Sequence, residues 1–335
     1  MNNCKKILVL GGTGAMGVYL VPELVKMGYK VHVVSLDNVK SDNPNIVYTQ
    51  GNGKDAVFLR ELMKNKYDAI VDFMMYFTKE FSEVYKIFLE NTNHYVFLSS
   101  YRVYADKESP ITEKSPRLLD VSDDKDYFAT EDYSLFKARE ENILNASGFG
   151  NWTIVRPAIT FSKFKYQLIT HEADVLIYRA FNKKRVVLPE AAMNIQGIMT
   201  WAGDVAKMFS YIILNKAAYK ETYTLSTAEH HTWKEISEYY KELIGLDCVW
   251  TDTETYLKFF DMPLQRDVKY KLLYDRCYNR VIDNTKILKI TGLKQTDFMT
   301  LEQGLKKELS ALPKDTVWPK TNTNDYMDEW LNKRY

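Results

Sequence analysis

Short apolar runs alternate with segments whose apolar residues recur at helical spacing along the first half of the chain. The apolar runs cover residues 7–10, 30–36, 46–48, 68–73 and 95–104. Helical spacing is found between them, in residues 15–27, 56–65 and 79–90. Strands that are apolar throughout and alternate with helices are typical of a parallel sheet covered on both faces. The pattern therefore predicts an α/β fold of the Rossmann type, with a doubly wound parallel sheet.

Three glycines at intervals of three residues follow the first predicted strand. Gly11 permits a tight turn, Gly14 lets the backbone approach a pyrophosphate, and Gly17 lets the next helix pack closely on the sheet. The free amides and the positive dipole end of that helix then face the phosphates. The spacing predicts a dinucleotide site formed by Gly11, Thr13, Gly14, Ala15, Met16 and Gly17.

The second predicted strand ends at Asp37, about twenty residues beyond the glycines. An acidic residue at this place holds the hydroxyls of the adenosine ribose. Asp37 favours NAD over NADP because a 2′-phosphate would meet a like charge, although Lys40 nearby keeps NADP possible. Pro22 conflicts with the pattern, since it falls inside the helix predicted over residues 15–27.

Residues 50–55 form a polar turn after the third apolar run. Such a turn commonly contacts the adenine, with Asn52 or Asp55 as the candidate residue, and an ordinary surface turn is an equal alternative. The helix predicted over residues 79–90 repeats apolar side chains at helical spacing, which indicates core or a subunit interface.

Charge and cysteine content narrow the class of partner. The 335 residues include 45 basic and 44 acidic side chains, whereas a general nucleic-acid binder normally has a basic excess. A small-molecule partner is therefore expected, and no nucleic acid. Three cysteines without metal-ligand spacing predict reduced cytoplasmic thiols and no metal site. The longest apolar stretch, residues 208–214, is too short to cross a membrane, and no signal peptide is expected.

Polar residues that suit acid–base chemistry follow the strand predicted over residues 95–104. Ser100 lies at its carboxyl end, where the ligand crevice of an open parallel sheet is found. The polar segment 105–130 is long enough to form a lid over that crevice. After it, Tyr133 and Lys137 lie one turn apart on one face of a predicted helix.

In this order and spacing, the glycine turn, Ser100 and the Tyr133/Lys137 pair resemble the extended short-chain dehydrogenase/reductase family, which includes the nucleotide-sugar epimerases. Residues 152–157 are similar to the next strand of that family. Residues 203–206 resemble the helix start that precedes its second lobe.

The resemblance covers roughly residues 5–210 and implies several further features. Phe73 and Pro157 are expected to contact the cofactor. A homodimer is expected, built on the helix over residues 79–90 and on the helix that begins near Tyr133. NAD is the cofactor that the resemblance and Asp37 both favour.

The chemistry of the three polar residues is consistent with this resemblance. A base must remove the proton of a sugar hydroxyl while hydride leaves the carbon. Tyr133 is the candidate base, and the Lys137 cation stabilises its phenolate form and can hold the nicotinamide ribose. Ser100 donates a hydrogen bond to the developing oxyanion and positions the substrate.

Two residues after Ser100 depart from the family pattern. Dehydratases of the family usually have acidic residues here, whereas this chain has Tyr101 and Arg102. An elimination step would therefore lack its expected proton donor. Both residues are candidate substrate contacts together with Ser100, although an exposed surface position is the favoured interpretation of Arg102.

The second half of the chain is less regular. Residues 1–160 are predicted to form the NAD-binding domain, with strands continuing to about residue 225. Residues 161–200 and 225–335 are predicted to form the substrate lobe and an aromatic tail. A nucleotide-sugar diphosphate needs a cationic clamp in that lobe, and the candidates are Arg179, Arg185, Arg276 and Arg280, with Gln196 as a polar partner.

These residues predict an NAD-dependent nucleotide-sugar epimerase or oxidoreductase. Two alternatives stay open from sequence. One is an NAD(P)H-dependent ketoreductase of another small substrate. The other is a non-catalytic Rossmann-fold protein that binds RNA, as in the chloroplast stem-loop-binding proteins, which the second lobe resembles loosely.

Overall fold

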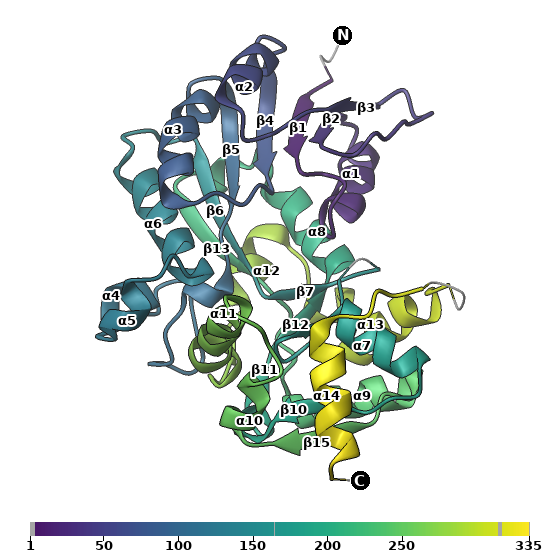
Figure 1. Ribbon diagram of the computed structural model, residues 1–335. Coiled ribbons are helices and arrows are strands. Elements are labelled where there is room, and N and C mark those ends of the chain that lie inside the picture. The colour runs from purple at the N-terminus through teal and green to yellow at the C-terminus, as the bar shows by residue number, and fades with distance from the viewer. Residues whose placement is uncertain (1–3, 164, 314–316, 335) are drawn as a thin grey trace.

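A seven-stranded parallel sheet forms the upper part of the molecule in Figure 1, a computed structural model that describes residues 4–163, 165–313 and 317–334. The order across the sheet is β13-β6-β5-β4-β1-β2-β3, and every neighbouring pair is parallel. The strands are β1 (Lys6–Leu10), β2 (Lys30–Ser35), β3 (Ile46–Gln50), β4 (Tyr67–Asp72), β5 (Thr92–Leu98), β6 (Trp152–Pro157) and β13 (Glu221–Leu225). The chain order reverses between β1 and β4, and this switch point places the ligand crevice. The predicted doubly wound sheet is confirmed.

Both faces of the sheet are covered by helices, because its strands are apolar on both sides. Ile7 and Val9 face one hydrophobic cluster, whereas Leu8 and Leu10 face another. The first cluster includes residues of α1 (Gly17–Lys26), α8 (Ala202–Ile212) and α12 (Thr285–Thr291). The second includes residues of α2 (Ala56–Met63), α3 (Thr78–Leu89) and α6 (Tyr133–Ala146).

A third hydrophobic cluster forms the core of the lower part of the molecule (Figure 1). Short paired strands frame it: β7 (Ile159–Phe161) with β12 (Met199–Trp201), β8 (Gln167–Leu168) with β9 (His171–Glu172), β10 (Val186–Pro189) with β15 (Cys248–Thr251), and β11 (Gln196–Gly197) with β14 (His231–Thr232). The helices here are α7 (Ala173–Phe181), α9 (Trp233–Ile244), α10 (Thr253–Leu257), α11 (Leu264–Lys271), α13 (Leu301–Ser310) and α14 (Asn322–Asn332). A π-helical turn, Leu272–Arg276, continues α11.

The C-terminal helix α14 packs on this lower part. Its Met327 and Leu331 are buried in the third cluster, and Trp330 packs edge-on against Phe259. The predicted aromatic tail thus includes, among its described residues, a helix that docks on the body. No helix among the described residues is long and apolar enough to span a bilayer.

Two sequence predictions are wrong in detail. The first helix begins at Gly17 instead of residue 15, and it continues through Pro22 on its exposed side. The strand predicted over residues 95–104 ends at Leu98. Its last residues form a 3₁₀ turn, Tyr101–Val103, because the Ser100 side chain accepts a hydrogen bond from the Arg102 amide and caps that turn.

The segment 105–130 is not a lid. It folds into two short helices, α4 (Leu118–Val121) and α5 (Lys125–Phe128), and the ring of Tyr127 in α5 packs on Tyr270 and Tyr274. None of its residues lines the cleft described below. The apolar side chains of this segment are buried, and their packing holds the segment away from the crevice.

Candidate active site

The glycine turn has the geometry that a dinucleotide requires. Gly11 has a positive φ of 73°, which disfavours any residue with a Cβ. A Cβ at Gly17 would lie 2.4 Å from the backbone of Gly12, so α1 can begin this close to the strand only with glycine. Gly14 is exposed, and only its own turn lies near the position of a Cβ. These contacts fit a pyrophosphate against the start of α1.

Asp37 stands at the end of β2 beside the same turn. Its carboxylate accepts hydrogen bonds from the Thr13 hydroxyl at 2.6 Å and from Ser35 at 3.2 Å. Asp37 is exposed, so its remaining lone pairs face solvent on the side of the glycine turn. This arrangement suits the hydroxyls of an adenosine ribose.

The other predicted cofactor contacts lie in two places, the turn before α2 and the cleft between the two parts of the molecule. Asn52 accepts a hydrogen bond from the Lys54 amide in the turn before α2, and Asp55 caps that helix by accepting from two amides. Phe73 packs edge-on against Phe209, with ring centroids 5.4 Å apart. Asn52 is exposed, whereas Phe73 faces the cleft between the sheet and the lower part of the molecule.

That cleft has a volume of about 330 Å³ and lies beyond the carboxyl ends of β1, β4, β5 and β6. Ser100, Tyr133 and Lys137 all line it, although they come from a strand end and a helix. Tyr133 is the first residue of α6, and Lys137 lies one turn further on. Predicted residues that also line the cleft are Met16, Phe73, Tyr101, Arg102, Pro157 and Arg276. The structure thus brings the three candidate catalytic residues to one site.

Lys137 has a charged partner that sequence reasoning missed. Its ammonium nitrogen lies 2.9 Å from Oε2 of Glu140, and both side chains are buried. Burial raises the pKa of Glu140 to about 7, although Lys137 opposes this shift. Burial also raises the pKa of the nearby Asp72 to about 6, despite hydrogen bonds from Tyr95 and the Met74 amide. When Glu140 is ionised, it offsets the charge that Lys137 presents to Tyr133.

A second carboxylate fixes α6 against the sheet. Glu141 accepts a hydrogen bond of 2.5 Å from Ser99 and forms an ion pair of 2.6 Å with Arg156 of β6. Arg117 pairs with the same carboxylate at 3.0 Å. These buried contacts join the end of β5, β6 and α6, and so they set where Ser100 stands relative to Tyr133.

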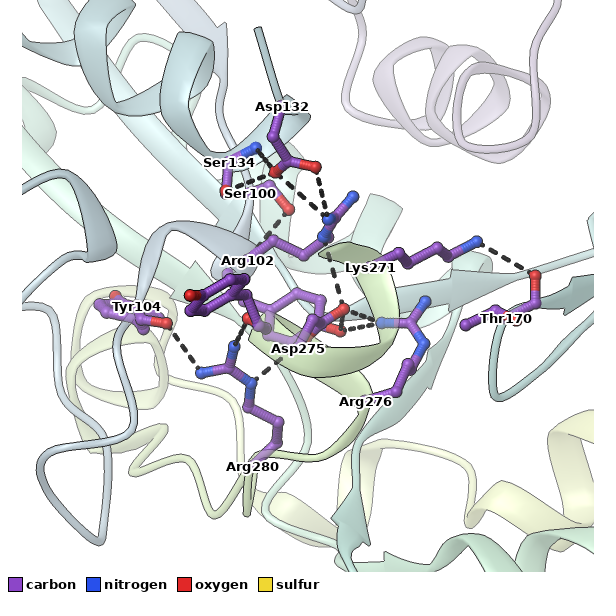
Figure 2. A network of polar contacts seen from close by, with 12 residues as sticks. Ser100, Arg102, Tyr104, Asp132, Ser134, Thr170, Lys271, Asp275, Arg276 and Arg280 are labelled. Carbon is purple, nitrogen blue, oxygen red and sulfur yellow. Dashed lines mark hydrogen bonds and ion pairs between the residues drawn. The ribbon is translucent and has the colours of Figure 1, made fainter. Parts of the chain in front are cut away.

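Cationic side chains gather on the wall opposite the sheet (Figure 2). The buried Asp275 carboxylate lies among three guanidinium groups and forms ion pairs with Arg102, Arg276 and Arg280. Although burial raises the pKa of Asp275, these arginines lower it below its ordinary value. The Tyr101 hydroxyl donates to Asp275 at 2.9 Å and accepts from Arg276 at 2.7 Å. The network holds Arg276 at the cleft in a fixed position.

Lys271 completes this wall. Burial and the Arg276 charge lower the pKa of Lys271 to about 8, while Glu172 at 3.2 Å opposes the shift. Arg102 bridges to Asp132 at 3.4 Å, so the expectation of an exposed arginine is wrong. Although burial lowers the pKa of Arg102, the carboxylates of Asp132 and Asp275 raise it above its ordinary value.

Four members of the predicted clamp lie elsewhere. Arg280 is buried behind Asp275 and donates to the Tyr104 carbonyl, and the Gln196 carbonyl accepts from the Arg280 amide. Arg179 is buried against α14, where it pairs with Asp328 at 2.8 Å. Arg185 lies with other cations at a different cavity. None of the four lines the cleft, because each is engaged within the lower part of the molecule.

Four residues of the cleft with a charged or amide side chain were not predicted from the sequence. They are Lys165, Gln167, Glu172 and Lys271. No short motif marks them, and the folding of residues 161–172 and of α11 brings them to the cleft. The available pattern was a polar side chain in each of the short strands β8 and β9, namely Gln167 and Glu172.

Comparison with known proteins agrees with this geometry. Residues 7–225 match the model of the NAD dependent epimerase/dehydratase family. Chloroplast stem-loop binding protein of 41 kDa b from Arabidopsis thaliana is 24% identical over 253 residues, which are 70% of this chain and 62% of that protein. The chain therefore spans less than two thirds of that relative.

Two solved structures share the fold. One is dTDP-glucose 4,6-dehydratase from Bacillus anthracis in complex with NAD, with a TM-score of 0.68 and 19% identity over 92% of this chain and 96% of that one. The other is WbmG from Bordetella bronchiseptica in complex with NAD and UDP, with a TM-score of 0.67 and 14% identity over 92% and 94%.

Proposed function

Because the chain belongs to the NAD dependent epimerase/dehydratase family, we propose that this NAD-dependent enzyme catalyses hydride transfer at a carbinol carbon of a nucleotide-activated sugar. One observation carries the proposal. Ser100, Tyr133 and Lys137 line one wall of a cleft whose opposite wall bears Lys271 and Arg276. Acid–base groups thus face a cationic surface of the kind that a diphosphate requires.

The proposed roles follow from position. Tyr133 takes the proton of the sugar hydroxyl, and Ser100 holds the oxygen of that hydroxyl by a hydrogen bond. Lys137 stabilises the phenolate of Tyr133 most strongly when Glu140 is protonated, because the ion pair with ionised Glu140 offsets its charge. NAD, when bound, supplies the hydride acceptor. Gly11, Thr13, Gly14, Ala15, Met16, Gly17 and Asp37 are the residues that would hold it.

The substrate side of the cleft supports an anionic ligand. Lys271 and Arg276 are the cations that we assign to the phosphates, with Arg102 and Tyr101 beside them. The two similar solved structures are consistent with such a ligand, since one is a dTDP-glucose dehydratase and the other is a complex with UDP.

Replacement of Tyr133 tests the reaction. We expect Tyr133→Phe to abolish turnover, by about 10³-fold or more, since it removes the acid–base group. NAD binding is expected to stay within about twofold. The matched control is Tyr211→Phe, an exposed tyrosine on α8. Turnover of UDP-glucose, dTDP-glucose and UDP-glucuronic acid is followed by reduced-nicotinamide absorbance and product chromatography. Near-normal turnover by the variant would refute the role of Tyr133.

Mass spectrometry of small molecules released on denaturation distinguishes the types of reaction. Near-stoichiometric NAD would indicate a cofactor that is recycled within each turnover, as in an epimerase. If denaturation releases no nicotinamide cofactor and the native protein binds added NADH or NADPH, the result would favour a ketoreductase.

RNA binding is a second candidate, favoured by the match to a chloroplast stem-loop binding protein. The near-zero net charge counts against it. Retention of the full chain on a stem-loop RNA column that falls steeply with salt would support RNA binding, because phosphate contacts release counterions.

The homodimer on α3 and α6 also stays a proposal. The outward positions of α3 are polar, among them Ser82, Glu83 and Lys86, so such an interface would depend on polar contacts. Sedimentation of the full chain at several salt concentrations tests it.

A further inference from the structure

A second cavity of about 610 Å³ lies beside the active-site cleft. The two share five lining residues, which are Met75, Arg102, Tyr133, Glu172 and Lys271. We call this second cavity the outer chamber. Its position means that a ligand whose reacting carbon is at Tyr133 can extend directly into it.

The cleft and the outer chamber have opposite charge. The charged residues that line the cleft are the carboxylate of Glu172 and five cations, Arg102, Lys137, Lys165, Lys271 and Arg276. The outer chamber is lined by only two cations, Arg102 and Lys271, and by five carboxylates, Glu131, Asp132, Glu172, Asp174 and Asp267. Both of its cations lie on the shared boundary, so the interior of the chamber is acidic.

The boundary cations are also neutralised by neighbours. Arg102 pairs with Asp132 at 3.4 Å, and Lys271 pairs with Glu172 at 3.2 Å (Figure 2 shows the side chain of Arg102 reaching toward Asp132). On the side of the chamber, carboxylates therefore accompany both cations and disfavour an anion there. The phosphates of a substrate belong in the cleft, and a different group belongs in the chamber.

Asp174 is the carboxylate of this chamber that is best placed to bind a cation. It lies in the first turn of α7 and accepts a hydrogen bond of 3.0 Å from the Val175 amide. Among the described residues, no cationic side chain forms an ion pair with it. Burial raises its pKa above the ordinary value, which is the response of a carboxylate that lacks a counterion.

His171 contributes a neutral ring to the chamber wall. Its Nε2 lies 3.0 Å from the Val187 carbonyl, to which it donates, and 3.2 Å from the Tyr256 hydroxyl. Its Nδ1 is buried and has no hydrogen-bond partner among the described residues. Burial lowers the pKa of His171 to about 3, so the ring adds no positive charge to the chamber.

Apolar and aromatic side chains form the rest of the chamber wall. Phe77, Phe136 and Phe260 contribute rings, and Leu264 and Val268 of α11 contribute aliphatic groups. Phe77 and Leu264 are about half exposed, so their apolar surface is open to a ligand that enters the chamber. Aromatic faces also attract cations.

We propose that the outer chamber binds a primary ammonium group carried on an apolar or aromatic frame. An ammonium group has three donors and no acceptor, which matches the carboxylate acceptors that line the chamber, above all Asp174. If the proposed function holds, the ammonium group is a substituent of the substrate and lies far from the reacting carbinol. Only this step from chamber ligand to substrate rests on the proposed function. The substrate is then anionic at one end and cationic at the other.

Three probes of nearly equal shape test the charge preference of the chamber. Benzylamine, benzyl alcohol and benzoate are titrated into the full chain near neutral pH, and binding is followed by ligand-observed NMR. We expect benzylamine to bind at least about fivefold more tightly than benzyl alcohol, and benzoate to bind most weakly. Equal or tighter binding of benzoate would overturn the proposal.

Two variants assign that binding to the chamber. Asp174→Asn should weaken benzylamine about fivefold and leave benzyl alcohol within twofold. Leu264→Lys should also weaken the binding of benzylamine, because it adds a like charge to the chamber wall. Leu264 is about half exposed, so we expect this variant to fold. Val57→Lys on the distant α2 is its control. Unchanged benzylamine binding in Leu264→Lys would refute the site even if Asp174→Asn failed to fold. Because the probes need no turnover, the result is independent of the Tyr133→Phe assay.

Discussion

The glycine turn and the cationic wall opposite it both bind charge, but they are built in different ways. The turn uses the backbone of seven consecutive residues, and its geometry depends on the absence of side chains at Gly11 and Gly17. The wall uses side chains held by partners far along the chain, as when Tyr101 meets Asp275. A backbone site is readable from local sequence, whereas a side-chain site exists only after the whole molecule has folded.

The largest predicted effect concerns the wall. Asp275→Asn leaves three buried guanidinium groups without their common carboxylate, so we expect a loss of about 3–5 kcal/mol in the free energy of unfolding. Urea denaturation measures it, with the exposed Asp267→Asn as control. A loss below about 1 kcal/mol would mean that the wall does not depend on Asp275.

The turn should respond to a single methyl group. Gly17→Ala places a Cβ 2.4 Å from the Gly12 backbone, which forces α1 away from the strand. We expect a cost of about 1–3 kcal/mol in stability and at least tenfold weaker NAD binding by calorimetry. Gly150→Ala is the matched control, since its Cβ would lie 3.5 Å from Lys220. Unchanged NAD affinity in Gly17→Ala would place the cofactor elsewhere.

A smaller effect should appear at the ribose end of the turn. Asp37→Ala removes the charge that repels a 2′-phosphate, and Thr13 loses its partner. The ratio of NADP to NAD affinity should rise about tenfold, which corresponds to about 1.4 kcal/mol. Asp42→Ala in the following exposed loop serves as control. A constant ratio would remove Asp37 from cofactor choice.

The smallest effect is expected on the sheet side of the cleft, at the buried Lys137–Glu140 pair. Because burial raises the pKa of Glu140 from 4.5 to about 7, the folded state binds its proton more tightly than the unfolded state. Stability should therefore fall as pH rises between these values. Glu140→Gln should flatten that fall by on the order of 1 kcal/mol.

Unfolding at several pH values measures this slope, and the exposed Glu83→Gln is the control. A remaining slope is expected from Asp72, whose pKa burial raises to about 6. An unchanged slope in Glu140→Gln would show that the Lys137–Glu140 pair does not titrate in this range.

Local pattern predicted much of the molecule. The parallel sheet, its covering helices and the positions of Ser100, Tyr133 and Lys137 follow from apolar runs and short motifs. The strand predicted through Tyr104 ended early because Ser100 caps a turn, which depends on one hydrogen bond. Lys271 escaped prediction because nothing near it in sequence marks it, and Arg179 was misplaced because its partner Asp328 lies on α14.

Glu141 has a consequence for anyone who tries to redesign this cleft. Its carboxylate contacts Ser99, Arg117 and Arg156 at once. The end of β5, which carries Ser100, and α6, which carries Tyr133, are therefore held together by the same side chain. Remodelling on the sheet side would move both residues together, and paired substitutions there would not behave additively. Lys165 and Lys271, which approach from the other wall, are the positions at which a library can change substrate choice while the acid–base geometry is kept.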